Sequence, residues 1–516
     1  MSEVPAITRS TLICSVRLVP VGGRAATDEP VDLRLAGGLV AEVGPSLAPG
    51  DAAEVHDGGG RWAIPGLWDQ HVHMRQWALD ALRLNLRGTA GPDDVARIVA
   101  DHLAALPRDR ATEVVTGFGH RSATWRRRPT VAELDAVSGD HPVVLISGDA
   151  HNGWLNSRAL ALLGVAPRDT PLDEIEWFEV LARLDTLPGS DARVEKGFRA
   201  VLTGAAAAGI VGVLDVEFGR GCRDWPARLA RGLDTLRVRT ATYPDHLDEV
   251  LAAGLRTGRP LPGGGDLLVM GPLKIILDGS LNTRTAYCDD PYADATGADA
   301  GQERSCGRLN YSRDELQALL GRARAHGLEV AVHAIGDAAV AVALDAIEAT
   351  GAAGSVEHAQ LMRWDDIARM ARLGIRAGVH PAHLLDDRDV SEQCWPDRAE
   401  RCYPLRALLD AGVTLAMGSD APVAPLDPWL AMAAAVHRSG DERPPWHPEQ
   451  SLTAAEALAA STDGQTTLAV GSRADVVLLD DDPLLAVGDS ARVAAHLRRM
   501  RVAATFVGGR PTYSAL

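Results

Sequence analysis

Short runs of alternating apolar and polar residues occur near both ends of the chain and predict β-strands there. Turns rich in Gly, Pro and Asp separate the runs in the N-terminal part. Similar runs return close to the C-terminus. We therefore expect one β-domain built from both termini, residues 1–62 together with 466–516. Its predicted strands cover residues 11–19, 31–35, 39–43, 475–479 and 502–507.

The middle of the chain alternates apolar runs with helical stretches, the pattern of βαβ units in a parallel sheet. Eight such strands favour an α/β fold with a (β/α)8 TIM barrel over residues 63–465. About 135 residues separate the first two strands, far more than a crossover needs. We expect residues 76–196 to be a mostly helical cap inserted after strand 1. The strands are predicted near residues 64–71, 210–215, 238–242, 273–277, 328–333, 355–358, 375–379 and 413–418.

Composition narrows the class of protein. Hydrophobic residues make up 46% of the chain and charged residues 23%, as in soluble globular enzymes. The net charge of −17 argues against nucleic acid or an anionic membrane as a partner. Six cysteines without a CxxC pair indicate free thiols in a reducing compartment. The N-terminus does not have the pattern of a signal peptide, and no long apolar run follows, so we expect a cytoplasmic protein.

Lysine is almost absent: of 52 basic residues only Lys196 and Lys274 are lysines. Lys274 lies in an apolar segment, residues 271–279, whose pattern predicts a buried strand. A desolvated amine there can act as a nucleophile, form a Schiff base or take up CO2 as a carbamate, whereas a guanidinium cannot. The alternative is a lysine that is ion-paired or extends to solvent at a strand end.

Chemically active side chains gather at the predicted strand ends. In a barrel of this kind the carboxyl ends of the strands carry the active site. Neutral imidazoles and a carboxylate suit zinc or a similar divalent ion, which lowers the pKa of bound water from about 16 toward about 7. Asp420 could accept the water proton as general base. The residues at these ends are His71, His73, Lys274, His333, His358 and Asp420.

These motifs together resemble the metal-dependent amidohydrolase superfamily, in its family 3 branch of YtcJ-like proteins and N-substituted formamide deformylases. The segments that carry the resemblance span nearly the whole chain. The resemblance implies a distorted barrel with a flanking β-sandwich, and makes the six residues above metal ligands, with Asp420 also the general base. The segments are residues 65–73, 149–157, 273–286, 333–337, 357–360 and 418–428.

The same resemblance implies that several further residues contact the substrate. His151, Trp154, Asn156 and Arg284 occupy matching positions. For Trp154 and Asn156 the alternative is packing and loop capping within the cap, and Arg284 could anchor its own loop to a carboxylate. The chain departs from the family's Gln-Pro-x-His after strand 7, where it has His380-Pro-Ala-His383. We expect His383 and the extra imidazole to influence substrate preference.

The expected activity is hydrolysis of a non-peptide C–N bond in a small molecule: an amide, an N-substituted formamide or a cyclic amide. The expected cofactor is one or two Zn ions, with Mn, Fe or Co as other candidates, and a carbamylated Lys274 as bridge. A homodimer is compatible with this predicted function. Trp125, Trp154 and Trp177 are candidate aromatic walls of the substrate pocket. Alternatives are a deaminase or ester hydrolase on the same site, a Schiff-base lyase, or a non-catalytic binding or regulatory homologue.

Overall fold

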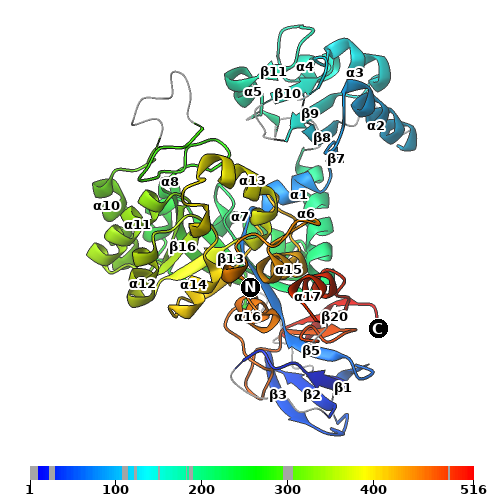
Figure 1. The fold of residues 1–516 in the computed structure, drawn as a ribbon. Coiled ribbons are helices and arrows are strands. Elements are labelled where there is room, and N and C mark those ends of the chain that lie inside the picture. Colours follow the sequence, from blue (N-terminus) through cyan, green and yellow to red (C-terminus); the bar gives the residue numbers. More distant parts are fainter. Residues whose placement is uncertain are drawn as a thin grey trace. The chain divides into compact units, whose positions relative to one another are not determined.

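In the computed structural model, eight parallel strands form a nearly closed sheet of the TIM-barrel type (Figure 1). The sheet closes where the amide of Asp420 donates to the carbonyl of His71 at 2.7 Å and the amide of His73 donates to that of Ala421 at 2.9 Å. Seven of the eight predicted barrel strands each overlap one strand of this sheet, and the first predicted strand overlaps it in part. In sheet order the strands are β18 (Leu415–Met417), β17 (Arg376–Val379), β16 (Gly354–His358), β15 (Val330–Ala334), β14 (Leu268–Ile276), β13 (Arg237–Thr242), β12 (Ile210–Asp215) and β6 (Leu67–Val72).

The first predicted strand, residues 64–71, is wrong as a single element. It divides at Gly66 into β5 (Trp62–Pro65), which pairs with β19 (Val476–Leu479), and the barrel strand β6. Gly66 packs so closely against Val211 that a Cβ at this position would overlap the valine side chain. The chain can therefore pass from one sheet to the next only with glycine here.

Strands from both ends of the chain form a second sheet of eight strands. Its order is β21-β20-β19-β5-β1-β2-β3, and β4 pairs with β1 off this path. Alternate side chains of these strands, including Ile13, Leu33 and Phe506, form a buried core. The remaining members are β1 (Ser10–Leu18), β2 (Val31–Ala36), β3 (Leu39–Gly44), β4 (Ala52–Asp57), β20 (Val502–Val507) and β21 (Arg510–Ser514).

Helices connect the barrel strands on the outside of the sheet (Figure 1). Capping boxes fix where several begin: Ser312 and Glu315 start α10, and Thr453 and Glu456 start α16. The crossover connections return each strand in parallel, so its carboxyl end reaches the same rim. The helices between barrel strands are α7 (Gly221–Ala230), α8 (Pro244–Ala252), α10 (Arg313–Ala325), α11 (Asp337–Thr350), α12 (Trp364–Leu373), α13 (Leu384–Cys394) and α14 (Leu405–Asp410). After the last barrel strand follow α15 (Pro428–His437) and α16 (Ala454–Ala460), and α17 (Ser490–Leu497) lies between β19 and β20.

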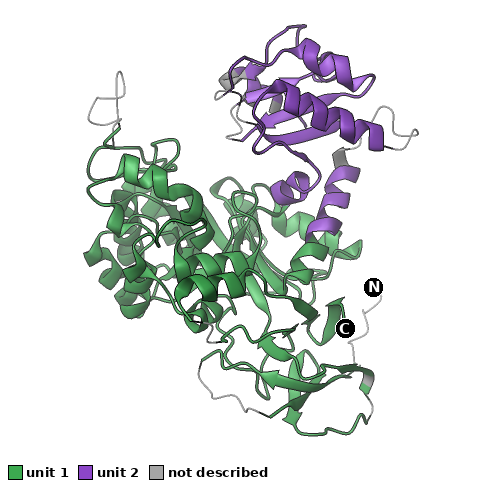
Figure 2. Cartoon of the chain, turned by 45° about the vertical axis from the view of Figure 1, so that its right-hand side comes forward, with its two compact units in different colours: residues 1–74, 202–516 green, residues 75–201 purple. Residues whose placement is uncertain are grey.

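The chain divides into two units (Figure 2), unit 1 with Met1–Met74 and Leu202–Leu516, and unit 2 with Arg75–Val201. Among the described residues, no helix combines the length and apolar character needed to cross a membrane. The structure describes residues 10–22, 29–50, 52–106, 114–120, 122, 125–148, 152–181, 183–184, 190–294, 306–485 and 488–516.

Unit 2 spans the residues of the predicted insertion, 76–196, and contains a sheet in addition to its helices. It contains a five-stranded sheet in the order β11-β10-β9-β8-β7. Apolar runs such as the fully buried β9 (Val143–Ser147) form this sheet and pack against the helices. The other elements are α1 (Met74–Asp80), β7 (Leu84–Asn85), α2 (Pro92–Ala105), β8 (Val115–His120), α3 (Val131–Ser138), β10 (Asn152–Leu155), α4 (Ser157–Leu162), β11 (Leu172–Asp173), α5 (Glu174–Leu181) and α6 (Ser190–Ala207).

Candidate metal centre

The two histidines at the end of β6 both lie beside Asp420. Nε2 of His71 is 3.6 Å from Oδ1 of Asp420, and Nε2 of His73 is 3.4 Å from the same oxygen. Asp420 has a φ of 57°, a left-handed conformation that is uncommon for a residue other than glycine and is found at functional sites. In this conformation the amide of Asp420 donates a hydrogen bond to the carbonyl of His71. The hydrogen bond holds the Asp420 residue against β6.

Asp420 is held in its ionised form. Burial raises the pKa of this carboxyl group, but the hydrogen bond with His73 and the nearby rings of His383 and His380 outweigh burial and lower it below its usual range. The carboxylate is therefore available at neutral pH as a ligand or as a proton acceptor.

Lys274 extends from β14 into the same cluster. The side chain is buried, and its Nζ lies 3.4 Å from Nε2 of His71. Burial lowers the pKa of the Lys274 amine, although the carboxylates of Glu357 and Asp420 act in the opposite direction. A lowered pKa increases the fraction of free amine, the form that reacts with CO2 or a carbonyl group.

His333 on β15 and His358 on β16 lie next to each other, with ring centroids 4.4 Å apart. Burial lowers the pKa of His358 well below its usual value and that of His333 to about 4. Both rings are therefore neutral at pH 7. Nε2 of His333 donates to the carbonyl of Gly279 at 3.1 Å, which leaves Nδ1 as its basic nitrogen.

A buried carboxylate determines which nitrogen of His71 carries the proton. Nδ1 of His71 donates to Oε2 of Glu357 at 2.6 Å, so Nε2 keeps its lone pair. The neighbouring Ser355 hydroxyl also donates to Glu357. On β17, Gly378 makes room for this carboxylate, since a Cβ there would overlap it. Metal-bound histidines commonly have such a partner.

The segment after β17 adds two more imidazoles. Nδ1 of His380 donates to the carbonyl of Gly418 at 3.1 Å, and the ring lies 4.7 Å from that of His71. Nε2 of His383 donates to the carbonyl of Ser419 at 3.2 Å and lies 4.0 Å from Oδ2 of Asp420. His383, predicted to face the substrate, thus lies beside the predicted general base.

Three sets of side chains have ligand atoms within 4.8 Å of one another and could hold a metal ion. In the described part of the chain, Nδ1 of His73 and Nε2 of His380 are buried nitrogens with no hydrogen-bond partner. Buried polar atoms are normally paired, so these two fit an ion as the missing partner. Neutral imidazoles with a carboxylate suit Zn²⁺ and similar ions. The sets are His71 with His358 and His380, His71 with His73 and Asp420, and His358 with His383 and Asp420.

The structure brings together all six predicted ligands, although His333 belongs to none of the three sets. Its ring contacts His358, but its Nε2 bonds to Gly279 and lies 3.4 Å from Oδ1 of Asp278. Lys274 contacts His71 and offers an amine, which is not itself a typical ligand. A carbamate on this amine would be a carboxylate-like ligand.

Two residues predicted to face the substrate lie inside unit 2. Trp154 is fully buried and donates from Nε1 to the carbonyl of Thr130 at 2.8 Å. Asn156, also fully buried, accepts from the amide of Ala159 at 3.0 Å and so caps α4. The alternative of packing and capping accounts for these contacts. His151 lies outside the described residues.

The candidate aromatic walls are core residues as well. Trp125 packs with Trp154 at a ring distance of 6.2 Å, and Trp177 is fully buried in a second core cluster of unit 2. Nε1 of Trp125 donates to the carbonyl of Thr89 at 3.0 Å. Their burial among side chains of unit 2 indicates a structural role.

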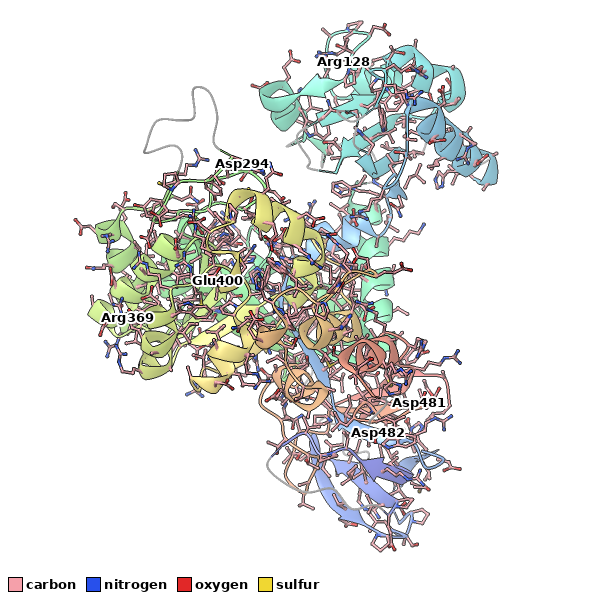
Figure 3. All side chains as sticks on the ribbon, viewed as in Figure 1. Arg128, Asp294, Arg369, Glu400, Asp481 and Asp482 are labelled. Carbon is pink, nitrogen blue, oxygen red and sulfur yellow. The ribbon has the colours of Figure 1, made fainter. Side chains whose placement is uncertain are left out.

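Arg284 forms an ion pair within its own loop. Nη2 of Arg284 is 2.7 Å from Oδ2 of Asp294, which is labelled in Figure 3, and Nη1 donates to the carbonyl of Asn282 at 2.8 Å. The residue has a φ of 55°. These contacts correspond to the alternative in which Arg284 anchors the loop after β14.

Sequence reasoning missed Phe218 and Asp278. Phe218 follows β12, is 54% exposed, and stacks on His73 with centroids 5.5 Å apart. Asp278 is fully buried and accepts from the amides of Ile335 and Gly336, which joins the loops after β14 and β15. Burial raises the pKa of Asp278 to about 7. An aromatic residue just after a strand end was the available signal for Phe218.

Known proteins resemble most of this chain. Residues 54–513 match the amidohydrolase family model for family 3. Protein LONG AFTER FAR-RED 3 of Arabidopsis thaliana is 28% identical, over 88% of this chain and 82% of that protein. N-substituted formamide deformylase of Arthrobacter pascens is 27% identical over 97% and 98%. The crystal structure of an uncharacterized metal-dependent hydrolase from Pyrococcus furiosus superposes with a TM-score of 0.76 at 25% identity, over 92% and 100%. The chain, with its histidines and aspartate at the barrel rim, belongs to the amidohydrolase family.

Proposed function

We propose that this protein is a metal-dependent hydrolase that cleaves a non-peptide C–N bond in a small molecule. The observation that carries the proposal is the gathering of imidazoles around the carboxylate of Asp420 at the carboxyl ends of the barrel strands. The likeness to N-substituted formamide deformylase over nearly the full length of both chains supports an amide, N-substituted formamide or cyclic amide as the substrate class.

The side chains present fit a divalent ion, which would supply Lewis acidity and lower the pKa of water toward about 7. His71, His73, His358 and Asp420 would hold one or two such ions, and His333, whose ring lies against that of His358, would be a further ligand. Where two ions bind, a carbamylated Lys274 would be the bridge between them. We propose zinc first, with manganese, iron or cobalt as substitutes, because imidazole nitrogens dominate the set.

Asp420 acts as the general base in this proposal. Its Oδ atoms accept a proton from the attacking water as the water oxygen bonds to the carbonyl carbon of the substrate. The C–N bond then breaks, and the proton passes from Asp420 to the leaving nitrogen. The carboxylate remains ionised between turnovers and can therefore accept a proton in each cycle.

The test combines metal content with a substrate panel. Protein purified without chelator is analysed by mass spectrometry for bound metal, and then assayed with N-substituted formamides, cyclic amides and matched esters. We expect at least one bound ion per chain and faster turnover of a C–N substrate than of its ester. The matched variants are Asp420→Asn, expected to be inactive, and Asp481→Asn at an exposed carboxylate (Figure 3), expected to match the unchanged protein.

Absence of bound metal after reconstitution with zinc or manganese and bicarbonate would contradict the proposal. Full turnover by Asp420→Asn would contradict the role of this residue as general base. If only the esters were hydrolysed, the proposed substrate class would change from C–N compounds to esters. The proposed metal site would be unaffected by that result.

A further inference from the structure

His380 has a basic nitrogen that no group in the described part of the protein uses. Its ring is 1% exposed, and its Nδ1 bonds to the carbonyl of Gly418 at 3.1 Å. A carbonyl oxygen only accepts, so Nδ1 carries the ring proton and Nε2 has the lone pair. In the described residues this buried Nε2 has no hydrogen-bond partner. An unpaired lone pair in the interior needs a donor or a cation.

Two further imidazoles converge on the same place. His71, on β6, has its lone pair on Nε2 because its Nδ1 donates to Glu357. His358, on β16, has its ring centroid 4.7 Å from that of His380 and 5.4 Å from that of His71. One nitrogen from each of the three rings lies within 4.8 Å of the others. An ion at about 2.1 Å from each nitrogen therefore requires only small side-chain movements.

The hydrogen bonds on the far side of the rings are those expected of metal ligands. Metal-bound histidines donate their other ring N–H to a carboxylate or a backbone carbonyl. His71 does so to Glu357, and His380 does so to Gly418. In this tautomer Nε2 of His380 cannot donate a hydrogen bond to a substrate carbonyl oxygen. A cation is thus a better partner for it than the polarised oxygen of a substrate.

We propose that His380 is a metal ligand and that it forms, with His71 and His358, a three-imidazole cation site from strands β6 and β16 and the segment after β17. The site selects a divalent ion that favours nitrogen, such as Zn²⁺ or Co²⁺, over Mg²⁺ or Ca²⁺. It deepens the proposed function, on whose metal site it rests. It requires neither the amine of Lys274 nor the carboxylate of Asp420, so this chain retains an ion when the lysine bridge is absent.

The experiment removes the lysine bridge and then the histidine. Lys274→Met keeps the side-chain length but cannot form a carbamate. Binding of Co²⁺ to the ion-free protein is measured by equilibrium dialysis and visible absorption for Lys274→Met alone, and with His380→Gln or His326→Gln added. His326 is an exposed histidine and serves as the matched control. We expect one ion per chain for Lys274→Met, a Kd raised more than about tenfold by His380→Gln, and no change from His326→Gln.

A second measurement leaves His380 in place. X-ray absorption of the Zn²⁺-loaded Lys274→Met protein should show three imidazole ligands. Two imidazoles with a carboxylate would indicate the set of His71, His73 and Asp420 and overturn the proposal. So would a Kd that His380→Gln changes less than about twofold. His380→Gln in the otherwise unchanged chain repeats the comparison if Lys274→Met does not fold.

These outcomes are separate from failure of the proposed activity. A protein that hydrolyses none of the C–N substrates, yet binds Co²⁺ in a way that depends on His380, would retain this site and lose the proposed reaction. A protein that binds no ion in any form would overturn both.

Discussion

Replacement of Glu357 tests the role of hydrogen bonding in preparing the imidazoles for an ion. Glu357 accepts from Nδ1 of His71 at 2.6 Å, and both side chains are at most 2% exposed. This bond keeps the lone pair of His71 on Nε2. Glu357→Gln removes the negative charge and allows the new amide to donate to Nδ1, so that the ring proton can move to Nε2. We expect weaker ion binding and an unchanged fold.

The size and sign of two effects follow from the structure. Loss of such a partner typically weakens metal binding by about 10- to 100-fold, which is about 1.4–2.7 kcal/mol. The ion-free protein should be as stable as before or more stable, because a buried carboxylate carries a desolvation cost that an amide largely avoids. Burial, which raises the pKa of Glu357, reflects the same cost. A purely structural role would instead lower the free energy of unfolding.

The assay is a competition titration of ion-free protein with Zn²⁺ against a chromophoric chelator, together with urea unfolding in the absence of metal. Glu329→Gln is the matched control, because Glu329 pairs with Arg376 at 2.6 Å and is partly exposed. Surface pairs of this kind contribute at most about 1 kcal/mol. An equal Zn²⁺ affinity for Glu357→Gln and the unchanged protein would refute the reasoning, as would an equal loss in the control.

Three further substitutions test other parts of the structure. Lys274→Arg should lose most of its activity while its circular dichroism spectrum stays the same, because a guanidinium cannot take up CO2; full turnover would exclude the bridge. Phe218→Ala should raise KM for aryl amides more than for short alkyl amides with unchanged metal content, because its exposed ring stacks on His73; an equal effect on both classes would count against this contact. Trp154→Ala should reduce the free energy of unfolding by about 3–5 kcal/mol in urea, whereas Trp364→Ala, at a side chain 45% exposed, should cost far less.

Most of the barrel was predictable because its strands are buried on both faces. Runs such as Ile210–Asp215, with every residue buried, appear in the sequence as short continuous apolar segments. The break at Gly66 was not predictable in the same way. The residues on either side of Gly66, Ile64-Pro65 and Leu67-Trp68, are all apolar. Only the close packing of Gly66 on Val211 shows that the chain changes sheets there.

The same reasoning could not distinguish the strands of unit 2 from helices. Its strands β7 and β11 are two residues long, and Val143–Ser147 is an apolar run that fits a buried helix equally well. Trp154 and Asn156 illustrate the related difficulty for side chains. A motif places them near a predicted pocket, but only the packing of β9, β10 and α4 shows that they are buried.

The histidines and the aspartate of the candidate site could be found from the sequence, but their hydrogen-bond partners could not. Position at a strand end was enough to find His71, His333, His358 and Asp420, because parallel strands deliver their carboxyl ends to one rim. The partners of these residues were not predictable. Glu357 is 286 positions away from His71 in the sequence, and its contact depends on the sheet order of β6 and β16.

Four rings of the cluster donate one N–H to a fixed acceptor, so the protein sets their tautomers before any ion arrives. His71 uses a carboxylate, whereas His333, His380 and His383 use backbone carbonyls. Backbone carbonyls cannot change charge and are positioned by the barrel itself, so three of the four bonds are independent of side-chain protonation. Such an arrangement leaves basic nitrogens close together in a desolvated site, a state that is unfavourable until a cation binds. The hydrogen bonds around the rings therefore add to the preference for a cation that the rings themselves create.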